Sequence, residues 1–271
     1  FGSSRSMKVE PKFVDERIPG FAFNAAVDSA TPEDFYTIYK YIINEKKHNI
    51  HAVVLGLDLE SFSNNRSIDN RLLANRHLIS YNQNTCLKLK SWSLLATDAV
   101  SYQYLRMSMQ SIGYAMTSYP MSKTQFDERG FLKYVILENQ ILNGSHDLDK
   151  LMDESKKEYE KRFSDFHYIS TEHYRTLIYL LDLLKKNKVT VYAYITPLHP
   201  DVISHLKETT KYRPRFNEIL PKLQKDFSER QMVFKNASDI TMFNGNIDEW
   251  YDGAHMTESN NRRLIKWLID K

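Results

Sequence analysis

The apolar residues of the chain follow two different spacings, and these predict strands and helices in alternation. Residues 50–59 contain the unbroken apolar run Ala-Val-Val-Leu, which is typical of a strand covered on both faces. Thr31-Pro32 is a helix start ahead of this strand, and an apolar stripe at helical spacing follows it at Phe35, Ile38, Tyr39 and Ile42. Helix and strand in this succession indicate a parallel sheet.

The same alternation returns after residue 170. A strand is predicted at 189–195, a helix at 215–227, a short strand at 232–234 and a closing helix at 259–269. The helix before the first of these strands has a stripe at Tyr174, Leu177, Ile178, Leu181 and Leu184. We therefore predict one α/β domain over residues 1–271, a three-layer sandwich with a central parallel sheet.

Residues 61–167 interrupt this pattern and are rich in Tyr, Met, Ser and Asn. Helical runs are predicted at 87–100, 102–116 and 131–142, with breaks at Gly113, Pro120 and Asn143-Gly144. We interpret this region as a mostly helical insertion. Its aromatic residues fit either packing within the insertion or a lid or substrate groove, and the sequence leaves both interpretations open.

Charge and cysteine content exclude several classes of function. The chain carries 37 Lys and Arg against 34 Asp and Glu, and the basic residues are scattered, so nucleic acid is not an expected partner. The single cysteine, Cys86, excludes an intrachain disulfide and a multi-cysteine zinc site. The pairs His48/His51 and His167/His173 lack the spacing of a zinc protease, and we predict neither a metal nor a cofactor. No apolar run approaches the roughly 18 residues of a membrane span.

The two ends of the chain carry the residues that point to catalysis. Gly2-Ser3-Ser4 stands near the beginning, and Asp252 and His255 lie close together near the end. A serine hydroxyl becomes a nucleophile when a histidine removes its proton, and the histidine works better when a carboxylate orients it. Gly2 allows a sharp turn out of a strand, which places the serines at the carboxyl edge of the sheet. These residues suggest a Ser-His-Asp triad split between the two ends.

The order of these blocks resembles that of the SGNH, or GDSL-like, hydrolase superfamily. Ser4 takes the place of the nucleophile, and Ser3 stands where the family usually has aspartate. Asp252 and His255 match the last block of the family. The resemblance covers the predicted βα framework at both ends and leaves out residues 61–167. It implies acyl transfer or ester hydrolysis through an acyl-serine.

Two departures from the family pattern fall on the oxyanion hole that the resemblance implies. Residues 24–29 resemble the second block, with Ser29 in place of the oxyanion glycine, and residues 55–58 resemble the third, with Asp58 in place of asparagine. A carboxylate donates no hydrogen bond unless protonated, and its charge opposes an oxyanion. Either the N–H groups of Ser4 and Ser29 form the hole alone, or Asp58 points elsewhere and caps its loop, or the enzyme is slow.

Gly2-Ser3-Ser4 and residues 196–200, Thr-Pro-Leu-His-Pro, look most like the envelope acyl-transfer branch of the superfamily. That branch includes relatives of alginate O-acetylation proteins and of the D-alanine transfer protein of teichoic acids. The resemblance implies an extracytoplasmic protein of a bacterial cell envelope, anchored by a segment before Phe1. It also implies a polysaccharide or cell-wall polymer as substrate, a small acyl group such as acetyl, and a membrane-bound acyltransferase as partner.

Three further polar residues are candidates for substrate binding. Arg5 would bind an anionic polymer or pair with a nearby acid, and His199 would bind a sugar or only form a turn. Asn24, in the second block, is the third candidate. The altered third block leaves a second function open, a catalytically degenerate module of the same fold that binds a polymer or a membrane partner. A Ser4 Oγ within hydrogen-bonding reach of His255 favours the enzyme.

Overall fold

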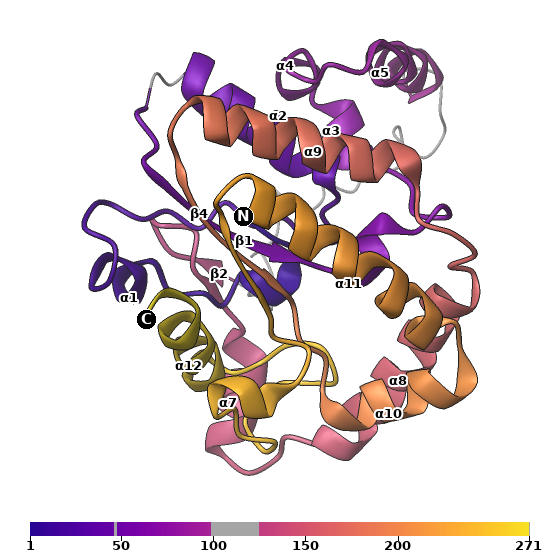
Figure 1. The fold of residues 1–271 in the computed structure, drawn as a ribbon. Helices are drawn as coiled ribbons and strands as arrows, with labels where there is room; N and C mark the ends of the chain where they lie inside the picture. Colours follow the sequence, from indigo (N-terminus) through magenta and orange to yellow (C-terminus); the bar gives the residue numbers. More distant parts are fainter. Residues whose placement is uncertain (46–47, 99–124, 271) are drawn as a thin grey trace, which may run out of the picture.

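Three parallel strands form the centre of the structure, a computed structural model that describes residues 1–45, 48–98 and 125–270 (Figure 1). Their order in the sheet is β1 (Ala52–Leu57), β4 (Thr190–Ile195) and β5 (Val233–Asn236). Leu55 of β1 lies opposite Ala193 of β4. The three predicted strands are confirmed, with small shifts at their ends.

Helices account for most of the other elements in the described chain. In order, the structure has η1 (Ser4–Ser6), α1 (Pro11–Asp15), α2 (Pro32–Asn44), η2 (Leu59–Phe62), α3 (Asn70–Ala74), α4 (Arg76–Ile79), α5 (Thr85–Asp98), α7 (Val135–Leu142), α8 (Leu148–Ser164), α9 (Thr171–Lys186), α10 (Pro200–Thr209), α11 (Tyr212–Glu229), η3 (Ile240–Phe243) and α12 (Glu258–Ile269), where η marks a 3₁₀ helix. A two-stranded antiparallel pair, β2 (Gln125–Phe126) and β3 (Leu132–Lys133), lies apart from the main sheet.

Side chains alternate between the two faces of the sheet, and helices cover both. Along β4, Val191 and Ala193 join one core with residues of α2, α9 and α11, while Tyr194 joins a second core with residues of α1 and α12. A strand buried on both faces reads as a continuous apolar run, which is the pattern seen in the sequence. The fold is therefore an α/β sandwich of three layers around a parallel sheet, as predicted.

The helix starts follow local sequence chemistry. Pro32 occupies the first position of α2, and the Thr31 N–H donates to Asp34 Oδ2 at 2.8 Å, so one otherwise unpaired group at this helix end is satisfied. Ser170 caps α9 by accepting a hydrogen bond from the His173 N–H at 3.3 Å. Both helices pack against each other on the same face of the sheet.

The first residues of the chain carry Ser4 to the carboxyl edge of the sheet. The Phe1 nitrogen donates to Val54 O at 2.8 Å, and the Gly56 N–H donates to Phe1 O at 3.0 Å, so Phe1 pairs in parallel with β1. A Cβ on Gly2 would collide with Ser6 Oγ, so glycine makes room for η1 to turn back against the strand end. Parallel sheets of this kind bind ligands at the carboxyl edge.

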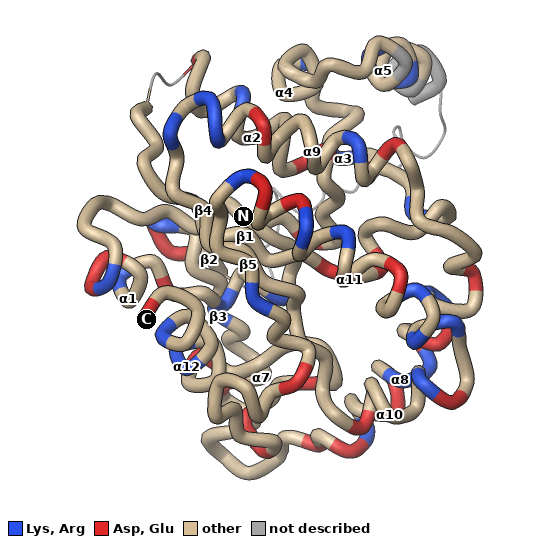
Figure 2. The backbone as a smooth tube through the Cα atoms, viewed as in Figure 1, with Lys and Arg blue, Asp and Glu red and all other residues tan. Residues whose placement is uncertain are grey.

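Residues 61–167 are mostly helical where the structure describes them. The helix predicted at 87–100 corresponds to α5, whereas the run 102–116 lies outside the described residues. The helix predicted at 131–142 is partly wrong, because Leu132–Lys133 pairs as β3 with residues 125–126 and the helix begins only at Val135. Figure 2 shows basic and acidic residues interspersed over the described chain. None of the described helices is long and apolar enough to cross a membrane.

Candidate active site

The structure brings the two ends of the chain together in a hydrogen-bonded Ser-His-Asp arrangement. Ser4 Oγ lies 2.9 Å from His255 Nε2, and His255 Nδ1 lies 2.8 Å from Asp252 Oδ2. An ionised carboxylate only accepts hydrogen bonds, so Nδ1 carries the imidazole proton and Nε2 is free to accept the proton of Ser4. The His255 and Asp252 side chains are 20% and 25% exposed, which leaves them in reach of a substrate. This is the geometry that a triad requires.

The loop that carries Asp252 and His255 is held by its own hydrogen bonds. Asp252 Oδ1 accepts the backbone N–H groups of Ala254 (2.7 Å) and His255 (2.8 Å), and the Tyr251 N–H donates to His255 O at 2.8 Å. Burial raises the pKa of the Asp252 carboxyl, but the charge and hydrogen bond of His255 outweigh it and hold that pKa below its usual value. The carboxylate therefore both orients the imidazole and shapes the turn.

A buried lysine ties this loop to the 61–167 region. Lys8 is 2% exposed, and its Nζ lies 2.7 Å from Glu138 Oε1 and 5.0 Å from the centre of the Tyr251 ring. Tyr134, from the same region, stands edge-on to His255 with ring centres 5.9 Å apart. Sequence reasoning missed Lys8, Tyr134 and Glu138, because nothing local distinguishes them from other polar and aromatic residues.

A small pocket of about 130 Å³ opens at Ser4. Its lining comes from the triad, from segments at the carboxyl edge of the sheet and from α8. The α8 residues are Ser155, Glu158, Tyr159 and Arg162. Part of the 61–167 region thus forms the site as well as packing on the core. Sequence reasoning did not single out these side chains.

Ser29 lies in a turn beside this pocket. The Ala30 N–H donates to Val27 O at 3.1 Å, which closes the turn, and Ser29 has a φ of +60° at its third position. Type II turns favour glycine at that position, the residue type that the resemblance expects there. Ser4 and Ser29 line the same pocket, and among the described residues neither backbone N–H has a hydrogen-bond acceptor. Two residues of this pocket therefore have backbone donors without a partner among the described residues.

Asp58 also lines the pocket and does not cap its loop. It precedes η2, but its side chain makes no capping hydrogen bond. Instead, Asp58 Oδ1 accepts the Thr196 hydroxyl at 2.6 Å and lies 3.6 Å from an Arg5 nitrogen. The loop-cap interpretation is therefore wrong. The carboxylate lines the same pocket as Ser4 and Ser29.

Arg5 is buried, which corrects its assignment as a substrate-binding residue. Its side chain is 4% exposed, forms an ion pair with Glu60 and donates to Thr196 Oγ1 at 2.9 Å. Burial lowers the pKa of the guanidinium, but Asp58 and Glu60 outweigh burial and raise it. An arginine enclosed in this way cannot reach a polymer. The alternative interpretation, pairing with a nearby acid, describes what the structure shows.

The other two candidates for substrate binding have structural roles. Asn24 Nδ2 donates to the backbone oxygens of Ser6 (2.8 Å) and Val9 (2.9 Å), which engages the amide within the fold. His199 is 4% exposed, its Nδ1 accepts the Asp201 N–H at 3.2 Å, and its Nε2 lies 3.2 Å from Ile247 O. Both assignments to substrate are therefore wrong. The polar atoms of each side chain form hydrogen bonds with nearby backbone groups.

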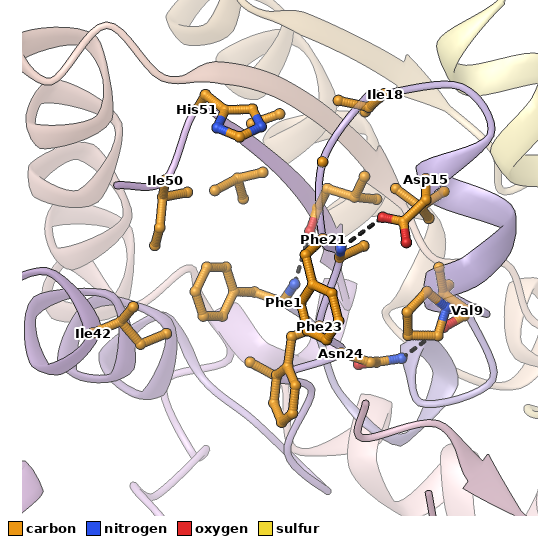
Figure 3. A pocket seen from close by; sticks show the side chains of 18 of the residues that line it. Phe1, Val9, Asp15, Ile18, Phe21, Phe23, Asn24, Ile42, Ile50 and His51 are labelled. Carbon is orange, nitrogen blue, oxygen red and sulfur yellow. Dashed lines mark hydrogen bonds between the residues drawn. The ribbon is translucent and has the colours of Figure 1, made fainter. Parts of the chain in front are cut away.

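A larger cavity lies away from the triad. It measures about 790 Å³ and runs beside β1, with apolar walls that include Phe1, Phe21 and Ile50 (Figure 3). Two of its polar residues bind nearby backbone: Asp15 accepts the Ala22 N–H at 2.6 Å, and His51 Nε2 lies 3.1 Å from Pro19 O. No triad residue lines it. The pocket at Ser4 is therefore the candidate active site.

Comparison of the sequence with models of protein families gives no match, and comparison with curated proteins gives none either. Among the described residues, no group of three or more His, Cys, Asp or Glu side chains is placed to hold a metal ion. The case for function rests on the geometry at Ser4.

Proposed function

We propose that the protein is an SGNH-type serine enzyme that transfers or hydrolyses a small acyl group. One observation carries the proposal: Ser4, His255 and Asp252 form a continuous hydrogen-bonded chain at the carboxyl edge of a parallel sheet. The backbone N–H groups of Ser4 and Ser29, two residues that line the pocket, have no other acceptor among the described residues and are the proposed donors to a tetrahedral intermediate.

The reaction follows from the positions of the donors and acceptors. His255 Nε2 takes the Ser4 proton as Oγ attacks an ester carbonyl, and Asp252 stabilises the imidazolium that forms. The N–H groups of Ser4 and Ser29 receive the negative charge on the carbonyl oxygen. His255 then gives its proton to the leaving alcohol, and an acyl-serine remains. Water or a sugar hydroxyl, deprotonated by the same imidazole, attacks the acyl-serine and restores Ser4.

The size of the pocket supports a small acyl group. At about 130 Å³ it falls below the roughly 300–1,000 Å³ of pockets that enclose drug-sized ligands. Acetyl or a group of similar size is therefore the proposed acyl. The resemblance supports the rest of the proposal: a polysaccharide or cell-wall polymer as substrate, a membrane-bound acyltransferase as partner, and an extracytoplasmic location at the cell envelope.

Asp58 favours a second candidate function. A carboxylate facing the oxyanion weakens catalysis, and an SGNH-type module that has lost turnover would bind a polymer or a membrane partner instead. The two candidates differ in a single observable, the covalent acyl-serine.

The experiment is incubation with p-nitrophenyl acetate followed by intact mass measurement. The unmodified protein should gain one acetyl group, and Ser4→Ala should abolish the gain. Ser6→Ala is the matched control, because Ser6 lies in the same 3₁₀ helix and its hydroxyl lies 3.0 Å from the Tyr194 hydroxyl rather than at the triad. If the unmodified protein never acquires an acetyl group, or if Ser4→Ala still acquires one, the acyl-serine is refuted and the binding module is favoured.

A further inference from the structure

The turn that carries the Ser29 N–H needs external support. Ser29 has a φ of +60°, and a residue other than glycine is disfavoured in that region by a factor of roughly 5–30. The relaxed alternative rotates the Asp28–Ser29 peptide, which converts the turn to type I with a negative φ at Ser29. That rotation turns the Ser29 N–H away from its present direction. Something in the fold must oppose it.

Two arginines bind the carbonyl oxygens of the two central residues of this turn. Arg71 Nη2 donates to Asp28 O at 3.0 Å, and Arg66 Nη2 donates to Ser29 O at 2.7 Å. Arg71 is itself oriented by Asp69, which accepts its Nε and Nη2 at 2.8 Å each. A guanidinium held by a carboxylate in two places has little freedom to turn away.

The position of Arg66 is fixed from the core. His173 Nε2 lies 2.9 Å from Arg66 O, and its Nδ1 lies 2.9 Å from the Glu33 carboxylate. The carbonyl and the carboxylate both accept, so both ring nitrogens donate. The backbone at residue 66 is therefore tied to α2 and α9, while the side chain reaches the turn.

We propose that Arg71, together with Arg66, is a positioning residue that holds the Asp28–Ser29 peptide with the Ser29 N–H toward Ser4. In a trans peptide the C=O and the N–H point in opposite directions, so an arginine on Asp28 O directs the Ser29 N–H to the other side. Rotation of the peptide would break that bond. The catalytic consequence rests on the proposed function, whereas the orientation of the peptide does not.

The kinetic test is a double substitution at Arg71 and Ser29. Arg71→Met should lower the rate of Ser4 acetylation about tenfold with KM changed less than about twofold, because an oxyanion donor acts mainly in the transition state. In the Ser29→Gly background the same substitution should lower the rate only about twofold, since glycine tolerates a positive φ without support. A general loss of structure would not be rescued by glycine at this one position.

Arg262→Met is the matched control. Arg262 is 46% exposed and pairs with Glu10 and Glu258, none of which lines the pocket at Ser4, and Arg71 is 58% exposed and pairs with Asp69. Arg262→Met should acetylate at the rate of the unmodified protein. If Arg71→Met does so as well, or if Ser29→Gly leaves the loss at tenfold, the positioning role is refuted.

A second measurement separates this inference from the proposed function. In the NMR spectrum of the unmodified protein, a positive φ at Ser29 predicts a strong cross-peak between Asp28 Hα and the Ser29 N–H. In Arg71→Met this cross-peak should weaken, and one between the Asp28 and Ser29 N–H protons should replace it. A rotated turn in a protein that never forms an acyl-serine rejects the proposed function and keeps the positioning role. An unchanged turn in Arg71→Met rejects the positioning role whatever the activity.

Discussion

Replacing Asp58 by asparagine tests whether the site is restrained by its own carboxylate. Asp58 Oδ1 is engaged by the Thr196 hydroxyl at 2.6 Å, and the side chain keeps 10% exposure at the pocket beside Ser4. The second oxygen, Oδ2, is thus left for the pocket. Asparagine has the same shape, can accept from Thr196 through its carbonyl oxygen, and would place an amide N–H where Oδ2 stands.

The expected gain is smaller than that of an ideal donor. One well-placed side-chain donor to an oxyanion is worth about 10²–10³ in kcat. The amide at position 58 would take its direction from Thr196 rather than from an oxyanion, so we expect a gain of about tenfold, or about 1.4 kcal/mol in the transition state. The loss of the buried charge should cost about 1–3 kcal/mol of stability. The cost stays limited because Arg5 keeps its ion pair with Glu60.

The assay is release of p-nitrophenol from p-nitrophenyl acetate, with the unfolding temperature measured on the same samples. Asp58→Ala is the control, since it removes the charge without adding a donor, and it should gain less than Asp58→Asn. If Asp58→Asn is no faster than the unmodified protein while remaining folded, then Oδ2 does not face the oxyanion and the reasoning is wrong.

Three further predictions concern the support of the site. Asp252→Asn should lower acetylation by a factor on the order of 10²–10⁴, measured by the burst of p-nitrophenol, because an amide favours the wrong tautomer of His255. His199→Ala should cost about 1–2 kcal/mol in urea unfolding, because it removes the α10 cap. Burial lowers the pKa of His173, but Glu33 outweighs it and raises that pKa above 6.5; burial raises the pKa of Glu33, but His173 holds it below 4.5. The pair therefore contributes its full stability between pH 4.5 and pH 6.5, the ordinary pKa values of the two groups. That stability is lost as the pH rises through the raised pKa of His173 or falls through the lowered pKa of Glu33. The free energy of unfolding, measured with urea at a series of pH values, should fall less steeply at both ends of the pH range in His173→Gln. An unchanged pH dependence at both ends would contradict the pairing.

The strands and the triad were accessible from the sequence because their signals are local. An apolar run and a helical stripe report burial directly, and Ser4, Asp252 and His255 sit in short blocks that a family resemblance can find. The pairing of Ser4 with His255 follows from the order of strands in a parallel sheet, which brings the carboxyl ends to one edge. The sequence therefore predicted the central sheet and the members of the candidate triad.

Buried charges were not accessible, because their partners are far away in the chain. Arg5 pairs with Glu60 and Lys8 with Glu138, and no spacing rule links positions so far apart. An isolated arginine next to a serine is read as a binding residue, when here burial and pairing make it part of the core. The prediction that Asn24 and His199 bind substrate was wrong for a related reason. Polar side chains near a site often satisfy backbone groups of the loops that form it, which a sequence does not show.

The two departures from the family pattern are compensated by different means. Ser29 costs backbone strain, and Arg66 and Arg71 offset it through the carbonyl oxygens of the turn. Asp58 brings a charge that opposes an oxyanion, but it lies 3.6 Å from Arg5, which also pairs with Glu60.

Arg162 adds a second cation to this cluster, 3.6 Å from Glu60, and it lines the pocket at Ser4. Glu158 also pairs with Arg162 and lines the pocket, so two arginines stand against three carboxylates and offset only part of the field that Asp58 exerts on an oxyanion. Arg5 also has its buried ion pair with Glu60, so the hydrogen-bonded triad is the feature that supports catalysis. Under the proposed function the triad favours an enzyme over a binding module, and Asp58→Asn measures how much the carboxylate limits its rate.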